Sequence, residues 1–478
     1  MRGIAICIRG DDPAVRFAAR ELARYLKRAT GRRIGLLGAR DSKAAVFRLG
    51  ICEDVGIARP KGLEAEDDWL RIQPDGAGYI LTGANGRSVL FAVYRYLGEL
   101  GFRWLRPGAR GEVIPSLTSP VRKGLCIDER PACRYRTLCL EGAASKEHVR
   151  DLIDWGAKQR MNGYFIQFEF GLCFFRRWYE HADNPDLKAE AIDPAAARAM
   201  AEDIIGEIKR RGLRFERVGH GWTCDVLGLP GEGWDAAAQA PAGARKGWLA
   251  RIGGKRQLFH GVPINTNLCY GRPEVRKAMT DAIVAYAIAH PEVDALHFWL
   301  ADGMNNHCEC DACRKARPAD FYVDMLNELD GKLAAAGLRT RVVFLVYVDL
   351  LWPPARNRIK NPDRFMLMFA PITRSYLSSF AEVEPEPMTA YARNQLRFPG
   401  NAGENAAYLR GWQRHFRGVG VAYEYHILWA CFYDLNHFTL GRTLHEDIRN
   451  LAGLGLDGLI SAQNQRASYP TDLLMDLR

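Results

Sequence analysis

Asp302 follows an apolar run, residues 295–301, that has the composition of a buried strand. A carboxylate at the end of such a strand is well placed to act as an acid, a base or a nucleophile. Three cysteines follow closely in the spacing Cys308-x-Cys310-x-x-Cys313. Thiolates with this spacing can bind a metal ion. One short segment therefore combines a candidate catalytic group with a candidate metal site that would fix its loop.

The cysteine cluster leaves several interpretations open. Its three thiolates would supply most of a tetrahedral zinc site of the structural kind. The fourth ligand would come from His307 or from a distant cysteine, Cys224 or Cys269. A disulfide or free thiols are the alternatives to zinc. A catalytic zinc is not expected, because no open set of histidine and carboxylate ligands accompanies the cysteines, and we expect catalysis to need no cofactor.

The length and composition predict a globular chain of two or three domains. It has 478 residues, of which 48% are hydrophobic and 26% are charged. No apolar run approaches the roughly 20 residues that span a bilayer, and the start lacks a signal-type apolar region. We therefore expect a soluble cytoplasmic protein, or a secreted one if a signal peptide has been removed. Most of the twelve cysteines are scattered singly, which is not the pattern of a disulfide framework.

The net charge of +10 favours an acidic partner, but the basic residues are dispersed among acidic ones. No run rich in lysine and arginine with interleaved aromatic residues is present, so nucleic acid is not expected as a partner. An anionic sugar or metabolite fits the charge better. The pattern does not indicate an oligomeric state.

The first 125 residues predict a small α/β sandwich domain. Asp12 and Pro13 open a helix whose apolar residues recur at helical spacing until Gly31. Short apolar strands are expected at residues 45–49 and 79–82. A second helix is expected from about Ser88 to Gly101. We expect this domain to be accessory to the catalytic part of the chain.

Residues 126–478 alternate short apolar strands with longer helical stretches, which is typical of parallel β/α units. Eight such units predict a (β/α)8 barrel of the TIM type. The chain stops soon after the eighth strand, so its last helix is short or missing from this sequence. The expected strands are residues 135–140, 163–168, 214–218, 295–301, 342–346, 365–369, 419–423 and 458–461.

The carboxyl ends of these strands carry acids and aromatic residues, and Glu141 follows the first. Carboxylates after strands four and seven, Asp302 and Glu424, would face each other across the barrel mouth. Paired carboxylates that flank a bond are what glycoside cleavage requires. Arg374 could bind a substrate carboxylate or orient Glu424. The candidate substrate contacts are Glu169, His220, Trp222, Tyr347, Asp349, Arg374, Tyr425, His426, Trp429 and Asn464, with Glu169 and Asp349 as reserve catalytic acids.

Residues 17–31 and 90–104 resemble the small domain that precedes the barrel in family 20 hexosaminidases and family 67 α-glucuronidases. From about Arg134 onward, with residues 154–162 and Asp302-Gly303 before the cysteines, the chain resembles the barrel family called domain of unknown function 4838. The resemblance implies a glycoside-hydrolase-like fold, with Asp302 where family 20 enzymes carry an Asp-Glu pair. Because Gly303 follows Asp302, we expect two-carboxylate rather than substrate-assisted chemistry.

Two functions of different classes follow. The first is an exo-acting glycosidase on an oligosaccharide that contains a uronic acid or an amino sugar, with Asp302 as general acid and Glu424 as nucleophile or base. The second is a non-catalytic carbohydrate-binding barrel. The separation of the two carboxyl groups discriminates them, because about 5–5.5 Å suits a retaining enzyme and about 6.5–9.5 Å an inverting one.

Overall fold

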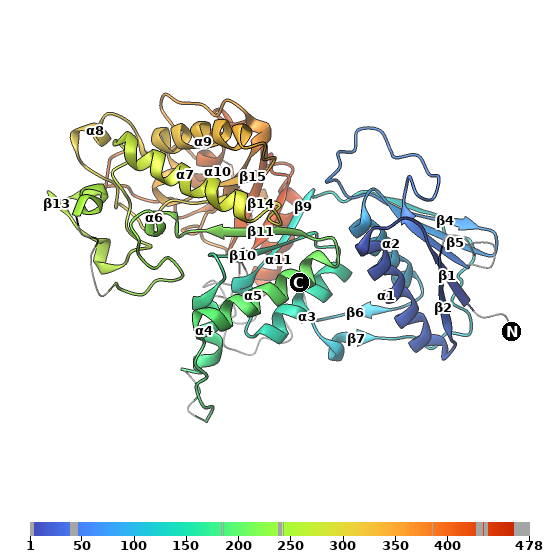
Figure 1. Ribbon diagram of the computed structural model, residues 1–478. Coiled ribbons are helices and arrows are strands. Elements are labelled where there is room, and N and C mark those ends of the chain that lie inside the picture. Colours follow the sequence, from blue (N-terminus) through green and yellow to red (C-terminus); the bar gives the residue numbers. More distant parts are fainter. Residues whose placement is uncertain are drawn as a thin grey trace.

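The computed structural model describes residues 4–38, 46–182, 184, 186–237, 241, 243–384, 386–426, 434 and 438–462. It contains an N-terminal sheet with two helices, followed by a closed barrel of eight parallel strands surrounded by helices (Figure 1). The predicted fold class is confirmed. Among the helices of these ranges, none combines the length and the apolar character of a bilayer-spanning segment.

The N-terminal sheet has six strands in the order β2-β1-β3-β5-β4-β8. Strands β2, β1, β3 and β5 run parallel, whereas β4 pairs antiparallel with both β5 and β8. Helices α1 and α2 pack together on one face of the sheet and lie between it and the barrel (Figure 1). The elements are β1 (Ile4–Ile8), α1 (Pro13–Thr30), β2 (Ile34–Leu37), β3 (Phe47–Ile51), β4 (Leu70–Asp75), β5 (Gly78–Gly83), α2 (Gly86–Glu99), β6 (Arg103–Trp104), β7 (Glu112–Val113) and β8 (Ile127–Glu129).

Helix α1 begins and ends where its capping residues predict. The Asp12 side chain accepts a hydrogen bond from the Ala14 N–H at 2.7 Å, and Pro13 occupies the first turn. Gly31 ends the helix in the left-handed conformation, with a φ of 67°. At the other end of this part of the chain, β8 still belongs to the N-terminal sheet, so the sheet reaches beyond the predicted boundary after residue 125.

All eight predicted barrel strands are present, and β18 closes the barrel against β9. The strands are β9 (Tyr135–Cys139), β10 (Gly163–Gln167), β11 (Arg214–Gly219), β14 (Ala295–Phe298), β15 (Arg341–Val346), β16 (Phe365–Phe369), β17 (Val419–Glu424) and β18 (Gly458–Ser461). Between them lie α3 (Lys146–Lys158), α4 (Leu172–Glu180), α5 (Pro194–Lys209), α6 (Trp222–Asp225), α7 (Pro273–Ala289), α8 (Asp311–Arg314), α9 (Pro318–Ala335), α10 (Ala402–Gln413) and α11 (Phe438–Asn450), with a small hairpin of β12 (Arg251–Ile252) and β13 (Lys255–Arg256).

Side chains from alternate strand positions fill the barrel interior. Within the barrel, Glu216 accepts hydrogen bonds from Arg214 Nη2 at 2.6 Å and from His297 Nε2 at 2.8 Å. Burial alone would raise the pKa of Glu216, but Arg214 and His297 together lower it to about 2. Phe165 stacks on the His297 ring at a centroid distance of 4.0 Å. Paired charges and packed rings therefore fill the barrel interior beneath Trp299.

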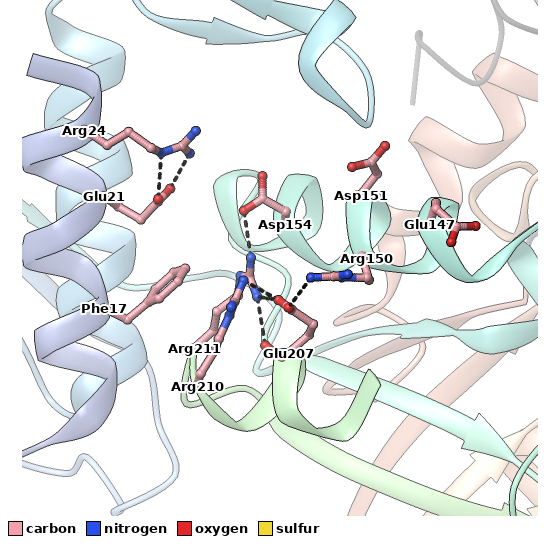
Figure 2. Close-up of a pocket in the computed structure, with 10 residues that line it drawn as sticks. All are labelled: Phe17, Glu21, Arg24, Glu147, Arg150, Asp151, Asp154, Glu207, Arg210 and Arg211. Carbon is pink, nitrogen blue, oxygen red and sulfur yellow. Dashed lines mark hydrogen bonds and ion pairs between the residues drawn. The ribbon is translucent and has the colours of Figure 1, made fainter. Parts of the chain in front are cut away.

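Helix α1 faces α3 and α5 of the barrel across a cavity of about 400 Å³ that is lined mainly by charged side chains (Figure 2). Arg211 contacts Asp154 Oδ1 at 2.8 Å and Glu207 Oε2 at 2.6 Å. Phe17 of α1 lies beside it, with the Arg211 guanidinium carbon 4.7 Å from the ring centroid. The N-terminal domain and the barrel therefore meet here through a cation–π contact to an arginine that is itself paired with acids of the barrel.

Asp68 joins the same two parts through a second, more buried contact. Its side chain accepts hydrogen bonds from Arg87 Nε at 2.7 Å within the N-terminal domain. It also accepts from Arg136 Nη2 on β9 at 2.6 Å and from Asn162 Nδ2 at 2.8 Å. Because Asp68 is only 6% exposed, its charge is balanced almost entirely by these partners.

We predict that Asp68→Asn lowers the free energy of unfolding by about 3 kcal/mol, because it leaves two largely covered guanidinium groups, 12% and 13% exposed, without their shared counter-ion. Urea denaturation followed by far-UV circular dichroism measures the change. Asp11→Asn is the matched control, because Asp11 pairs with Arg16 at 2.7 Å but its side chain is 99% exposed. Equal denaturation midpoints for the two variants would contradict the structural role of Asp68.

Candidate active site

A cavity of about 290 Å³ opens at the carboxyl ends of the barrel strands. This is the end at which barrel enzymes carry their catalytic groups. The lining combines two carboxylates, one histidine, five aromatic rings, one amide and three aliphatic or thioether side chains. These residues are Glu141, Gln167, His220, Trp234, Trp299, Asp302, Leu345, Tyr347, Met368, Ile372, Tyr423 and Tyr425.

Asp302 is held from three directions. Its Oδ2 accepts a hydrogen bond from Trp234 Nε1 at 2.7 Å, and its Oδ1 accepts one from the Tyr347 hydroxyl at 3.1 Å. Its backbone N–H donates to the Ile264 carbonyl at 2.9 Å. The side chain remains 21% exposed, so a molecule in the cavity can reach it. Asp302 is thus both fixed and accessible, which a reacting group requires.

His220 lines the same cavity as Asp302. Its Nδ1 is 2.7 Å from the Leu300 carbonyl, and because a carbonyl can only accept, Nδ1 carries the proton. Its Nε2 is 3.9 Å from Asp302 Oδ1. Burial lowers the pKa of His220 despite the opposing charge of Asp302. The ring is therefore neutral at pH 7 and presents an acceptor nitrogen toward the carboxylate.

Glu141 supplies the second carboxylate of the cavity, from the 3-10 turn Leu140–Gly142 directly after β9. Burial, and then the negative charges of Asp302 and Glu141, raise the pKa of Tyr347 well above its usual value. The same two charges also contribute to the raised pKa of Tyr425. Both carboxylates therefore act on one pair of tyrosine hydroxyls, which stay protonated and can donate hydrogen bonds.

Two polar atoms of the lining are buried without a partner in the described part of the chain, Trp299 Nε1 and Gln167 Oε1. Each side chain is 3% exposed. Trp299 packs edge-to-face with His220 at a centroid distance of 4.8 Å and with Tyr423 at 5.8 Å. A buried donor and a buried acceptor without partners are costly unless a bound molecule satisfies them. A polar ligand in the cavity, with hydroxyl or amide groups, would supply such partners.

Glu424, the predicted partner of Asp302, lies outside this lining. It is 2% exposed, with Oε1 3.5 Å from Arg374 Nη1. Arg374 in turn contacts Asp447 Oδ2 at 2.6 Å, and His426 Nε2 contacts the same oxygen at 2.9 Å. Burial raises the pKa of Glu424 even though Arg374 opposes the shift. The structure thus places Glu424, Arg374 and His426 in a buried ion cluster behind the cavity wall.

Some of the remaining predicted substrate contacts line the cavity and others do not. His220, Tyr347 and Tyr425 line the cavity. Glu169 does not, and it pairs with Arg198 at 2.7 Å with its side chain 40% exposed. Trp222 and Asp349 do not line it either: Trp222 donates to the His297 carbonyl at 2.9 Å, and Asp349 accepts from the Asn305 N–H at 2.9 Å. Burial raises the pKa of Asp349 to about 6. Two predicted contacts fall outside the described residues, Trp429 and Asn464.

Several lining residues were given no role from the sequence. Glu141 was recognised only as one of the strand-end acids, and Trp299 was assigned to the apolar strand before Asp302. Trp234 lies in the glycine-rich segment 231–234, where no periodic pattern marks it. Its contact with Asp302 joins residues 68 positions apart, so no local signal could have found it.

The three cysteines of the predicted metal site do lie together. Cys308, Cys310 and Cys313 are joined by Cys269, and the four Sγ atoms all lie within 4.8 Å of one another. Of the candidate fourth ligands, the structure thus selects Cys269 over His307 and Cys224. Each of the four has a free thiol.

Glu232 fixes the segment that contributes Trp234 to the cavity lining. Its carboxylate accepts hydrogen bonds from the backbone N–H groups of Glu169 at 2.6 Å and Leu172 at 3.2 Å. Burial raises the pKa of Glu232 to about 7, and the backbone donors only partly offset that effect. This carboxyl therefore changes its charge near neutral pH, two residues from the tryptophan that holds Asp302.

Comparisons with known proteins identify the fold. No family model matches the chain, and no curated protein matches it. The resemblance to domain of unknown function 4838 therefore stays a prediction. Among solved structures, a GH138 enzyme targeting pectin rhamnogalacturonan II is 12% identical, with a TM-score of 0.54, over 98% of this chain and 47% of that one.

A GH115 4-O-methyl-α-glucuronidase with specificity for decorated arabinogalactans is 11% identical, with a TM-score of 0.55, over 99% of this chain and 55% of that one. A Streptomyces plicatus N-acetyl-β-hexosaminidase is 17% identical, with a TM-score of 0.47, over 89% of this chain and 72% of that one. The chain spans about half the length of the first two structures. It shares its fold with glycoside hydrolases.

We predict that the stability difference between the wild type and Glu232→Gln depends on pH. A carboxyl whose folded pKa is raised to about 7 stabilises the fold fully below its unfolded pKa, and this contribution is lost as the pH rises through 7. Between pH 5 and pH 8, the wild type should therefore lose ~2 kcal/mol of unfolding free energy relative to the variant. Thermal and urea denaturation across this range measure the loss.

The control for this experiment is Glu180→Gln, because Glu180 is exposed at the end of α4. Its comparison with the wild type measures the effect of a Glu-to-Gln change at an exposed position over the same pH range. A Glu232→Gln difference that stays flat would show that Glu232 does not titrate in this range.

Proposed function

We propose that this chain is a glycoside hydrolase that removes a terminal sugar from an oligosaccharide. The observation that supports this most strongly is the single cavity in which Asp302 and Glu141 lie among aromatic rings. Two carboxyl groups that flank one bond are the minimal machinery of glycoside cleavage. Flat rings such as Trp299 and Tyr425 suit the C–H faces of a sugar, while the unpaired Trp299 Nε1 and Gln167 Oε1 suit its hydroxyls.

We assign Asp302 the part of nucleophile or general base and Glu141 that of general acid. Both oxygens of Asp302 accept hydrogen bonds, from Trp234 and Tyr347, so the carboxylate is oriented without a proton of its own to deliver. A general acid must instead bring a proton to the leaving oxygen. This assignment replaces the pair Asp302 and Glu424, because Glu424 faces Arg374 behind the wall.

The substrate we favour is an uncharged or amino sugar rather than a uronic acid. The described lining contains two carboxylates and neither lysine nor arginine, so a uronate would meet repulsion there. Arg374, the predicted ligand for a substrate carboxylate, is engaged with Asp447 and has no exposed side-chain surface. The volume of about 290 Å³ is at the lower end of the roughly 300–1,000 Å³ usual for ligand sites, which suits one sugar ring and exo action.

We predict opposite leaving-group effects for the two carboxylate variants. Glu141→Gln should lower kcat/KM about 10²–10⁴-fold on glycosides with poor leaving groups, because these need a proton at the departing oxygen. It should have far less effect on a dinitrophenyl glycoside. Asp302→Asn should impair both substrate types, and added azide should restore turnover. A panel of aryl N-acetylhexosaminides, neutral glycosides and α-glucuronides provides the measurement.

If the wild-type chain binds sugars from this panel in calorimetry but turns over none, the non-catalytic carbohydrate-binding barrel is the correct function. Full activity of either variant on poor leaving groups would overturn its assigned role. Turnover of the glucuronides in preference to the other glycosides would overturn the substrate class while leaving the hydrolase proposal intact.

We predict that Glu424→Gln lowers stability rather than turnover. Removing the charge leaves Arg374 with Asp447 alone, which should reduce the free energy of unfolding by ~2 kcal/mol. The kcat of the folded enzyme should stay within a few fold of the wild type. Glu169→Gln is the control, since Glu169 is half-exposed and lies outside the cavity lining. If Glu424→Gln folds normally and loses turnover as Asp302→Asn does, Glu424 is the second catalytic carboxylate.

A further inference from the structure

Four cysteines meet beside the segment that carries Asp302. The Sγ atoms of Cys269, Cys308, Cys310 and Cys313 all lie within 4.8 Å of one another. The Sγ atom of Cys269 is 3.5 Å from that of Cys310 and 3.8 Å from that of Cys313. A tetrahedron of thiolates around zinc, with Zn–S bonds of about 2.3 Å, places its sulfur atoms about 3.8 Å apart. We infer that these four thiolates bind a structural zinc ion.

The neighbouring backbone is arranged to support thiolates. The Arg251 N–H donates to Cys308 Sγ at 3.2 Å, and the Gly271 N–H donates to Cys313 Sγ at 3.1 Å. Such second-shell donors stabilise negative sulfur ligands. The Arg256 Nη2 lies 3.8 Å from Cys269 Sγ. Its positive charge offsets part of the net negative charge that four thiolates retain around a divalent cation.

The two segments approach so closely that one position has to be glycine. A Cβ at Gly271 would lie 2.9 Å from the Ala312 backbone and the Cys313 nitrogen. Gly271 thus lets the segment that ends with Cys269 reach the turn of Cys310 and Cys313 at the start of α8. A closed site whose four protein ligands leave no open position is of the structural kind rather than the catalytic kind.

The cysteines form a small buried cluster of their own, next in sequence to the main-core residues Leu249, Leu268 and Tyr270. The local cluster of buried hydrophobic residues contains only Ala250 and three of the cysteines. Hydrogen bonds continue from the cluster toward the active site: Asn267 Nδ2 donates to Asn306 Oδ1 at 2.7 Å, and Asn306 Nδ2 donates to the Asn265 carbonyl at 2.7 Å. The Asp302 N–H then donates to Ile264 at 2.9 Å. The zinc site therefore cross-links residues 264–269, which contact Asp302, to residues 302–313, which include it.

The test is the metal content of the full chain, purified from medium supplemented with zinc and measured by mass spectrometry. The wild type should carry one zinc per chain. Cys269→Ser and Cys313→Ser should each lower zinc occupancy more than about tenfold. Cys126→Ser and Cys224→Ser are the controls, because Cys126 is exposed and Cys224 is buried outside the cluster. Both controls should keep the metal, and loss of zinc from either would overturn the assignment.

A second measurement on the wild type covers the case in which the serine variants fail to fold. Replacing the metal with cobalt(II) should produce thiolate-to-cobalt charge-transfer absorption and the visible bands of a tetrahedral ion. Cobalt spectra without the thiolate band, iron in place of zinc, or a disulfide between two of the four cysteines in non-reduced peptide maps would each overturn the proposal. Because none of these readouts uses turnover, the result is independent of the proposed hydrolase activity.

Discussion

Closure of the barrel between β18 and β9 is the constraint on which the candidate site depends. The two strands pair from Gly458 opposite Tyr135 to Ser461 opposite Leu138. A Cβ at Gly458 would lie 1.9 Å from the Tyr135 carbonyl oxygen, so only glycine allows this approach. Because closure brings the first and last strands together, Glu141 after β9 can line the same cavity as Tyr425 beyond β17.

The fold could be predicted because each barrel strand is a short apolar run between helices with clear end signals. β15 and β16 are buried on both faces, and their sequences, Arg-Val-Val-Phe-Leu-Val and Phe-Met-Leu-Met-Phe, reflect this directly. Asp12 and Gly31 likewise identify α1 through local capping chemistry. The N-terminal sheet was predicted less completely, because its strands β1, β2, β4 and β8 were not expected. β8, which lies beyond the expected boundary, is a short edge strand with no strong pattern of its own.

The site was harder to predict. A residue at the carboxyl end of a strand lies at the catalytic end of the barrel, but this does not say whether its side chain points into the barrel or away from it. Val421, Tyr423 and Tyr425 belong to the interior cluster of the barrel, so the strand's two-residue alternation turns Glu424 outward. There it meets Arg374 instead of the cavity. Asp302 follows irregular chain after β14, so no alternation rule applies to it, and its direction is set by Trp234 and Tyr347. The alternation along β17 could have shown that Glu424 points away from Asp302, but the expected pairing did not take it into account.

The long connection between α6 and α7 explains why the rest of the site could not be found from local pattern. It contributes the Trp234 donor and the Ile264 acceptor that hold Asp302, yet its regular strands, β12 and β13, are two residues long. A ladder that short cannot fix a segment by itself. The connection must therefore be held by bonds to chain that is distant in sequence, and the contact of Cys269 with Cys313, 44 positions away, is of this kind. Precision at Asp302 thus depends on such long-range bonds together with the buried residues of the connection, among them Leu249, Ile264 and Leu268.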